Sequence, residues 1–119
     1  MSMALMDLQA AVIAHLNWKS RLTDFFYGLE NLTIADVPDH TRCDFGKWLY
    51  DRGLKDLAGL SETNRMEMLH KEVHEDIRAI VSMSKEQRES DDGKARLTKF
   101  KDKCDQFVEM LERMEKQVK

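Results

Sequence analysis

Apolar side chains recur every three or four positions in three long stretches of the chain, and this spacing predicts amphipathic helices. The stretches cover residues 4–31, residues 62–88, and residue 94 toward the C-terminus. Their apolar seams are Leu5, Leu8, Val12, His15, Leu22, Phe26 and Leu29; Met66, Leu69, Val73, Ile77, Ile80 and Val81; and Leu97, Phe100, Cys104, Phe107, Leu111, Met114 and Val118. We therefore expect three long helices, each with one buried face.

A shorter helix is predicted between the first and second of these. Residues 31–42 are polar and form a loop, and residues 43–53 follow as a short helix. Thr41 is the expected N-cap and Gly53 the expected C-cap residue, because these residue types favour the two ends of a helix. Cys43 then lies in the first turn of the short helix.

The remaining connections are short. Residues 54–60 lead to Ser61, the expected N-cap of the helix over residues 62–88, and residues 89–93 form a polar, acidic turn. Helices joined by short polar turns pack antiparallel. The predicted fold is all-α: an antiparallel four-helix bundle with one short helix that carries Cys43, formed by residues 1–119 as a single domain.

The composition excludes several classes of protein. Charged residues make up 34% of the 119 residues and the hydrophobic set 42%, as in globular domains. The net charge is −3 with no basic block, so we expect no nucleic-acid partner. No apolar run reaches the roughly 18 residues of a membrane span, and the first residues do not resemble a signal peptide. We expect a cytoplasmic protein whose two cysteines are free thiols or metal ligands.

The candidate chemistry begins with His70 and His74, which form an H-x-x-x-H pattern on a predicted helix. Residues four positions apart share a helix face, so the two imidazoles could hold one metal ion. Both lie on an apolar face, as does His15, where unpartnered imidazoles cost a few kcal/mol each. A hydrogen bond to a backbone carbonyl would explain any one of them, but three together favour a metal.

Cys43 completes a set of four donors. A cysteine at a helix N-terminus favours the thiolate, which is a soft ligand. Three histidines and one cysteine suit tetrahedral Zn²⁺ with no open coordination position, which argues against hydrolytic catalysis. Cys104 occupies a regular seam position and is expected to be a core residue, and His40 to be exposed in the loop. Three acids are candidates to hydrogen-bond the outer nitrogens of the ligands: Asp39, Asp44 and Glu67.

Three motifs together suggest a family. His15-x-x-Trp18, then C-x-F-G-x-W from Cys43 to Trp48, then the histidine pair resemble the chemoreceptor zinc-binding domain, over most of the chain. The resemblance implies a four-helix bundle whose zinc ligands are His15, Cys43, His70 and His74. It also implies a bacterial protein, often dimeric, fused to chemoreceptor or diguanylate cyclase domains and sensing zinc or oxidants such as hypochlorous acid. No GGDEF or GGEEF motif and no methyl-accepting coiled coil is present, so the domain either stands alone or is part of a longer protein.

The function expected from these observations is a zinc-binding sensory or regulatory domain, not an enzyme, that works as a homodimer with a signalling partner. Its switch would be Cys43, whose short helix is the most mobile element that holds the metal. A purely structural zinc site remains an alternative, as does a metal-free helical interaction module. A di-iron bundle would need a second inward E-x-x-H copy. A zinc peptidase would need H-E-x-x-H, whereas the sequence here is H-K-E-V-H.

Overall fold

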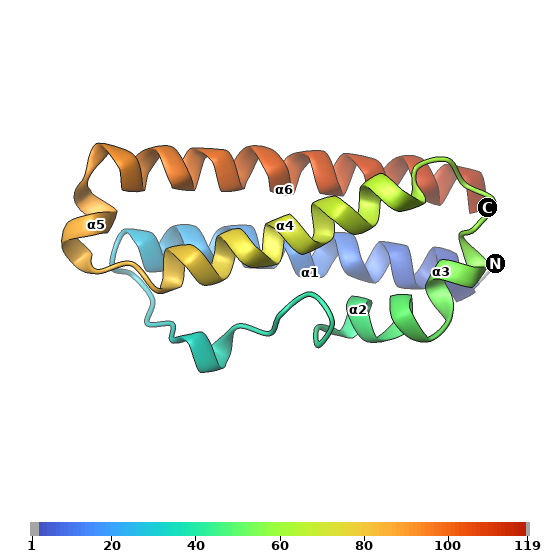
Figure 1. Ribbon diagram of the computed structural model, residues 1–119, viewed down its shortest axis with the longest axis horizontal. Helices are drawn as coiled ribbons and strands as arrows, with labels where there is room; N and C mark the ends of the chain where they lie inside the picture. The colour runs from blue at the N-terminus through green and yellow to red at the C-terminus, as the bar shows by residue number, and fades with distance from the viewer. Residues whose placement is uncertain (1–2, 119) are drawn as a thin grey trace.

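The computed structural model describes residues 3–118, and none of these residues forms a β-strand. Three long helices, α1 (Met3–Phe26), α4 (Thr63–Val81) and α6 (Asp91–Val118), lie against one another, and α6 runs opposite to α1 and α4 (Figure 1). The prediction of an all-α fold is confirmed.

The fourth helical element is short and lies against α1 near both ends of the chain (Figure 1). It begins with α2 (Asp44–Trp48), continues through a π-helical segment (Leu49–Gly53), and ends with α3 (Leu54–Asp56). The predicted C-cap at Gly53 was wrong, because Gly53 is helical with φ −58°. Its missing side chain instead makes room for the Trp48 ring, whose nearest atom would lie only 2.7 Å from a Cβ at this position.

Helix α1 ends earlier than its apolar seam predicted. It stops at Phe26, and Gly28 turns the chain with φ 83°, a left-handed conformation that glycine adopts without strain. Leu29, placed in the seam by sequence, is 79% exposed. Residues 27–43 then run back along the outside of the molecule toward α2, with one 3-10 turn at Ile34–Asp36 (Figure 1).

The second predicted helix is divided in two. Helix α4 ends at Val81, and α5 (Lys85–Glu89) begins after Ser84. The Ser84 hydroxyl accepts a hydrogen bond from the Gln87 N–H, and the Gln87 side chain accepts one from the Ser84 N–H. This capping box starts a new helix and explains why the prediction through residue 88 was too long.

The ends of the long helices also differ from the expected caps. Ser61 is not the N-cap of α4; Glu62 takes that position without a side-chain cap bond. The turn predicted at residues 89–93 is reduced to the bend at Ser90. Gly93 lies inside the first turn of α6, where a Cβ would overlap the carbonyl oxygen of Gln87.

The core is built from the predicted seams of all three long helices. Its fully buried side chains include Leu8 and Leu22 from α1, Met66, Ile77 and Ile80 from α4, and Phe100, Phe107, Leu111 and Met114 from α6. Cys104 is 0% exposed, which confirms it as a core residue. Its thiol donates a weak hydrogen bond of 3.5 Å to the His15 carbonyl oxygen. The core therefore reaches the histidines predicted to bind metal.

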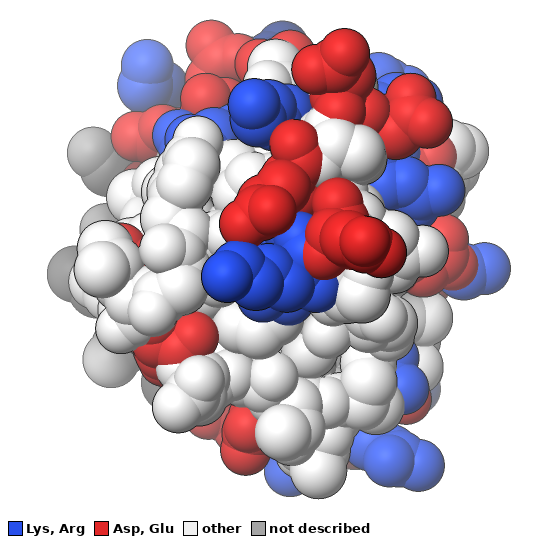
Figure 2. Space-filling view, turned by 90° about the vertical axis from the view of Figure 1, so that its left-hand side faces the viewer, with Lys and Arg blue, Asp and Glu red and all other residues white. Residues whose placement is uncertain are grey.

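Charges of both signs are mixed on the surface. At the end of the molecule that carries α5, Lys and Arg side chains lie beside Asp and Glu side chains, and a large part of this face is uncharged (Figure 2). Within residues 3–118, every helix is too short or too polar to cross a lipid bilayer.

Candidate metal centre

The four residues predicted as ligands come together in the interior. His15 projects from α1, Cys43 stands at the start of α2, and His70 and His74 project from α4. One donor atom from each lies within 4.8 Å of the other three. Two of these separations are 3.3 Å: His15 Nε2 to His74 Nε2, and Cys43 Sγ to His70 Nε2. Residues from three separate elements thus converge on one point.

The outer nitrogens of two histidines fix the direction of their inner nitrogens. His15 Nδ1 donates a hydrogen bond of 2.7 Å to the Ala11 carbonyl, and His74 Nδ1 donates one of 2.9 Å to the Pro38 carbonyl. With the proton on Nδ1, each neutral ring presents a lone pair at Nε2. The two lone pairs face each other across 3.3 Å, so neither nitrogen can satisfy the other. A cation between them would satisfy both.

Burial keeps these imidazoles neutral. His15 is 2% exposed, and desolvation lowers its pKa to about 4 although the Ala11 hydrogen bond acts the other way. Desolvation likewise lowers the pKa of His74 and His70, and the neighbouring histidines lower that of His70 further. Neutral imidazole is the form that binds metal. No proton must therefore leave these three residues at neutral pH before a metal binds.

His70 is held differently from the other two. Its ring stacks on Phe107 with the ring centres 5.3 Å apart, and Phe45 meets it edge-on at 5.1 Å. Its Nδ1 is buried and has no hydrogen-bond partner within the described part of the chain. Aromatic packing, not a hydrogen bond at Nδ1, therefore orients this ring.

Cys43 is itself the N-cap of α2, not Thr41 as predicted. Its Sγ accepts a hydrogen bond of 3.3 Å from the Gly46 N–H. Burial raises the pKa of the Cys43 thiol, and the N–H groups of Gly46 and Phe45 offset this only in part. The N–H groups at the helix N-terminus do favour the thiolate, as expected, but burial outweighs them. A nearby cation is needed to keep the sulfur ionised at neutral pH.

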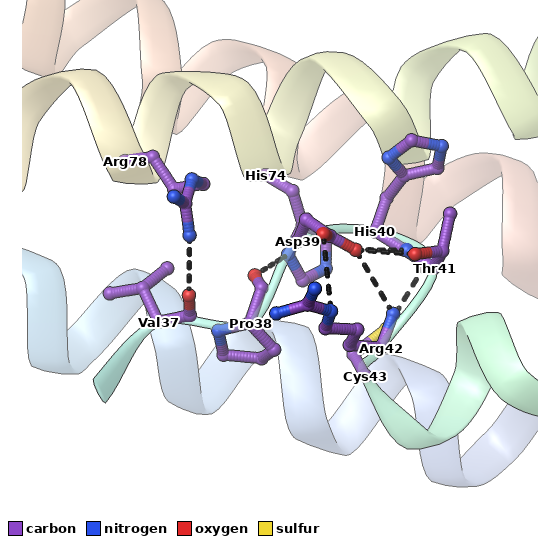
Figure 3. Close-up of polar contacts among 9 residues, drawn as sticks. All are labelled: Val37, Pro38, Asp39, His40, Thr41, Arg42, Cys43, His74 and Arg78. Carbon is purple, nitrogen blue, oxygen red and sulfur yellow. Dashed lines mark hydrogen bonds and ion pairs between the residues drawn. The ribbon is translucent and has the colours of Figure 1, made fainter. Parts of the chain in front are cut away.

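The strap, which we define as residues 37–43, carries Cys43 to the other ligands and is fastened to α4 (Figure 3). Arg78 donates a hydrogen bond of 2.8 Å to the Val37 carbonyl, next to the bond from His74 to Pro38. The Asp39 carboxylate then accepts hydrogen bonds from the N–H groups of Thr41 and Arg42 and folds the strap into a turn. Asp39 thus shapes the strap, and among the described residues its carboxylate does not hydrogen-bond the outer nitrogen of a candidate ligand histidine, contrary to prediction.

The other proposed supporting residues are also outside the cluster. Among the described residues, neither Asp44 nor Glu67 hydrogen-bonds to any of the three imidazoles. His40 is half-buried, not exposed as predicted, and its ring centre lies 6.0 Å from that of His70. Backbone carbonyls take the role that we assigned to acids. The carbonyl four residues before a helical histidine could have been anticipated for His15, but nothing in the sequence pointed to Pro38.

The donor set fits zinc in composition and size. Three imidazole nitrogens and one sulfur form a shell typical of tetrahedral Zn²⁺, with Zn–N bonds of about 2.05 Å. In a tetrahedron with bonds of about 2.05 Å, two ligand nitrogens lie about 3.3 Å apart. The separation of His15 Nε2 and His74 Nε2 equals that distance, whereas pairs up to 4.8 Å apart would have to close.

The metal-free protein is expected to lose stability as the pH falls from about 6.5, the pKa of histidine in the unfolded chain, toward 4. Folding lowers the pKa of His15, His70 and His74, so over this range the unfolded state binds protons that the folded state does not. His15, whose pKa in the folded state is about 4, then lowers the free energy of unfolding by about 1.4 kcal/mol per pH unit, and the lowered pKa values of His70 and His74 act in the same direction. Urea unfolding in a chelator at pH 7.5 and 5.5 measures the difference.

The matched variants for this experiment are His15→Leu and His40→Leu. The first should reduce the pH dependence by about 1.4 kcal/mol per pH unit, because His15 no longer titrates on unfolding. The second should change it less than the first, since His40 lies outside the cluster and only its charge acts on His70 and His74. Equal urea midpoints at the two pH values in the wild-type protein would contradict the prediction.

The comparisons with known proteins agree with this geometry. The model of the chemoreceptor zinc-binding domain (CZB) family matches residues 15–81, which is more than half of the chain and includes all four residues of the cluster. No curated protein and no solved structure gives a significant match. The extent of the family match makes the assignment: this chain belongs to the chemoreceptor zinc-binding domain family.

Proposed function

We propose that this domain binds one Zn²⁺ through His15, Cys43, His70 and His74 and serves as a sensory or regulatory domain. The convergence of three inward-facing imidazoles and one thiol within 4.8 Å carries the proposal. The lone pairs of His15 and His74 face each other across 3.3 Å, and a cation between them would satisfy both. The same cation would ionise the Cys43 thiol, whose pKa is raised by burial. The family match supports zinc as that cation.

A closed shell of four protein ligands suits regulation better than catalysis. Zinc supplies a charge that holds the thiolate ionised, and with four protein ligands it has no position for a reactive water. The seam of α6 contributes Cys104 and phenylalanines to the core beside the site, and no acid or base. We therefore propose a role that is not enzymatic.

Cys43 is the residue that we propose as the switch. It is half-buried, whereas the three histidines are 0–2% exposed, and it is the only member of the set that does not project from a long helix. Modification of its sulfur would release Cys43 and α2 from the site while the histidines stay in place on α1 and α4. Phe45 and Trp48, packed together at 5.7 Å, would move with α2.

Elemental analysis of the purified chain tests the site. We expect about one zinc per chain, an affinity weakened on the order of 100-fold in Cys43→Ser, and no stoichiometric zinc in His70→Ala, because each variant removes one ligand. His40→Ala is the matched control and should retain zinc. Absence of zinc, or full occupancy in both ligand variants, would overturn the assignment.

A structural zinc site is the second candidate function. The deep burial of three ligands favours it, because metal that bridges buried elements stabilises a fold directly. Exchange kinetics separate the two functions. A sensory site exchanges zinc with a chelator within minutes or reacts at Cys43, and α2 then moves. A structural site retains both zinc and the position of α2 until the domain unfolds.

The biological setting follows from the family. We propose that the domain acts in a bacterial signalling system, such as a chemoreceptor or a diguanylate cyclase, in the cytoplasm. We further propose a homodimer and a fused or separate output partner. We regard the architecture as an antiparallel four-helix bundle in which α2 and α3 form the short helix. Zinc and oxidants are the two signals that we propose.

A further inference from the structure

A cavity of about 350 Å³ opens beside the metal centre, between α1 and the start of α2. His15 and Cys43 both line it, whereas His70 and His74 do not. The cavity therefore reaches one side of the cluster, and on that side lies the only thiol of the site. Cys104, the other thiol of the chain, is fully buried in the core and does not border this cavity.

Small side chains on α1 keep the cavity open. Ala10 and Ala14 are four positions apart and so lie on one face of the helix, and both line the cavity and are exposed to solvent. Trp18, one turn further along α1, and Phe45 from α2 add aromatic walls. A larger residue at position 10 or 14 would extend into the space that leads to Cys43.

The charged groups that line the cavity disfavour anions. Asp7 and Asp44 contribute two carboxylates, and Arg42 contributes one guanidinium. Arg42 is already engaged with Asp39, whose carboxylate lies 3.6 Å away. The charge of the lining is negative in sum, so a negatively charged molecule is repelled. A small uncharged molecule is not repelled and can pack against the alanine and aromatic side chains of the same cavity.

We propose that this cavity is the access and binding site for small, uncharged, thiol-reactive molecules that modify Cys43, and that Ala10 and Ala14 set the size limit. This inference rests on the proposed role of Cys43 as the switch and adds the route by which a reactant reaches the sulfur. It also identifies residues outside the metal site that determine selectivity.

The probe that tests the inference is methyl methanethiosulfonate, which is small and neutral. The Cys43 thiolate attacks its sulfenyl sulfur, a new S–S bond forms, and methanesulfinate leaves with the electron pair of the old S–S bond. Mass spectrometry of the full zinc-loaded chain follows the mixed disulfide at Cys43 with time. Dithiobis-nitrobenzoate, a bulky dianion, serves as the excluded reagent.

Ala14→Leu is expected to slow the reaction of Cys43 with the small reagent at least tenfold, while Ala14→Ser keeps the wild-type rate. Ala95→Leu adds the same bulk at an exposed position of α6 outside the cavity and should change nothing. In the wild-type protein, the bulky dianion should react at least 100-fold more slowly than the neutral reagent, relative to their rates with free cysteine. Zinc content should be the same in all four proteins.

Two outcomes would overturn the inference: an unchanged rate in Ala14→Leu, or equal slowing in Ala14→Leu and Ala95→Leu. Failure of the proposed zinc function gives a different result. If the chain holds no zinc, the same rates are measured on the metal-free protein. If Ala14→Leu then reacts as fast as the metal-free wild-type protein, the cavity is not the access site. If Ala14→Leu still reacts more slowly, the cavity is supported as the access site although the zinc assignment has failed.

Discussion

Removal of zinc is expected to lower the thermal midpoint of the wild-type domain by about 15 °C. Zinc in thousandfold excess over its dissociation constant stabilises the folded state by about 4 kcal/mol, because it binds folded and not unfolded protein. For a domain of this size, each kcal/mol shifts the midpoint by about 4 °C. Circular dichroism melts with zinc and with a strong chelator measure the difference directly.

The domain should nevertheless remain folded without zinc at neutral pH. Its core contains large aromatic and aliphatic side chains from all three long helices, and these do not depend on the metal. His70→Ala is the control: its midpoint should be the same with and without chelator, since it binds no stoichiometric zinc. A wild-type midpoint that is insensitive to chelator would show that no metal is linked to folding.

Gly46→Ala is expected to destabilise the domain by on the order of 3 kcal/mol, as overpacking against rigid groups does. A Cβ at position 46 would overlap the carbonyl oxygen of His40, and the backbone of Thr41 lies close behind it. Backbone atoms cannot rotate away as a side chain would, so the strap must move. Because the strap carries Cys43, zinc affinity should fall about 100-fold in the same variant, equivalent to about 2.7 kcal/mol.

Gly59→Ala is the matched control, because nothing lies within 4 Å of a Cβ at that position. It should change the free energy of unfolding by less than about 0.5 kcal/mol, as surface substitutions usually do. Urea denaturation gives the stability of both variants, and competition with a chromophoric chelator gives their zinc affinity. Near-native stability and affinity in Gly46→Ala would mean that the strap is not tightly packed against α2.

The long helices were predictable because their buried faces follow a regular spacing. The seam of α6 from Leu97 to Met114 is buried as expected. The errors lie where local chemistry competes with that spacing. Gly28 ends α1 although Leu29 continues the pattern, and Ser84 with Gln87 starts a new helix inside an apparently continuous one. Both features were readable from the sequence, as a glycine near a helix end and an S-x-x-Q pattern.

The candidate metal site was predictable from residue types, whereas its supports were not. Histidines on apolar helix faces need partners, and this property identifies His15, His70 and His74 from the sequence. The strap follows no periodic pattern, and its position depends on hydrogen bonds between Arg78 and Val37 and between His74 and Pro38. The two hydrogen bonds join residues that are 36 and 41 positions apart in the chain. Both are accepted by backbone carbonyl groups, which every residue possesses, so no residue type marks these bonds in the sequence.

The two nitrogens of His74 connect the metal centre to the strap. Nε2 belongs to the donor cluster, and Nδ1 is bonded to the Pro38 carbonyl. If the strap docks more tightly when metal is present, thermodynamic linkage requires that anything holding the strap in its docked form raises zinc affinity by the same factor. A protein that grips the outer surface of residues 37–42 would therefore act on the metal without touching it. In such a complex, the zinc concentration at which the domain responds would be a property of the complex and not of the four ligands alone.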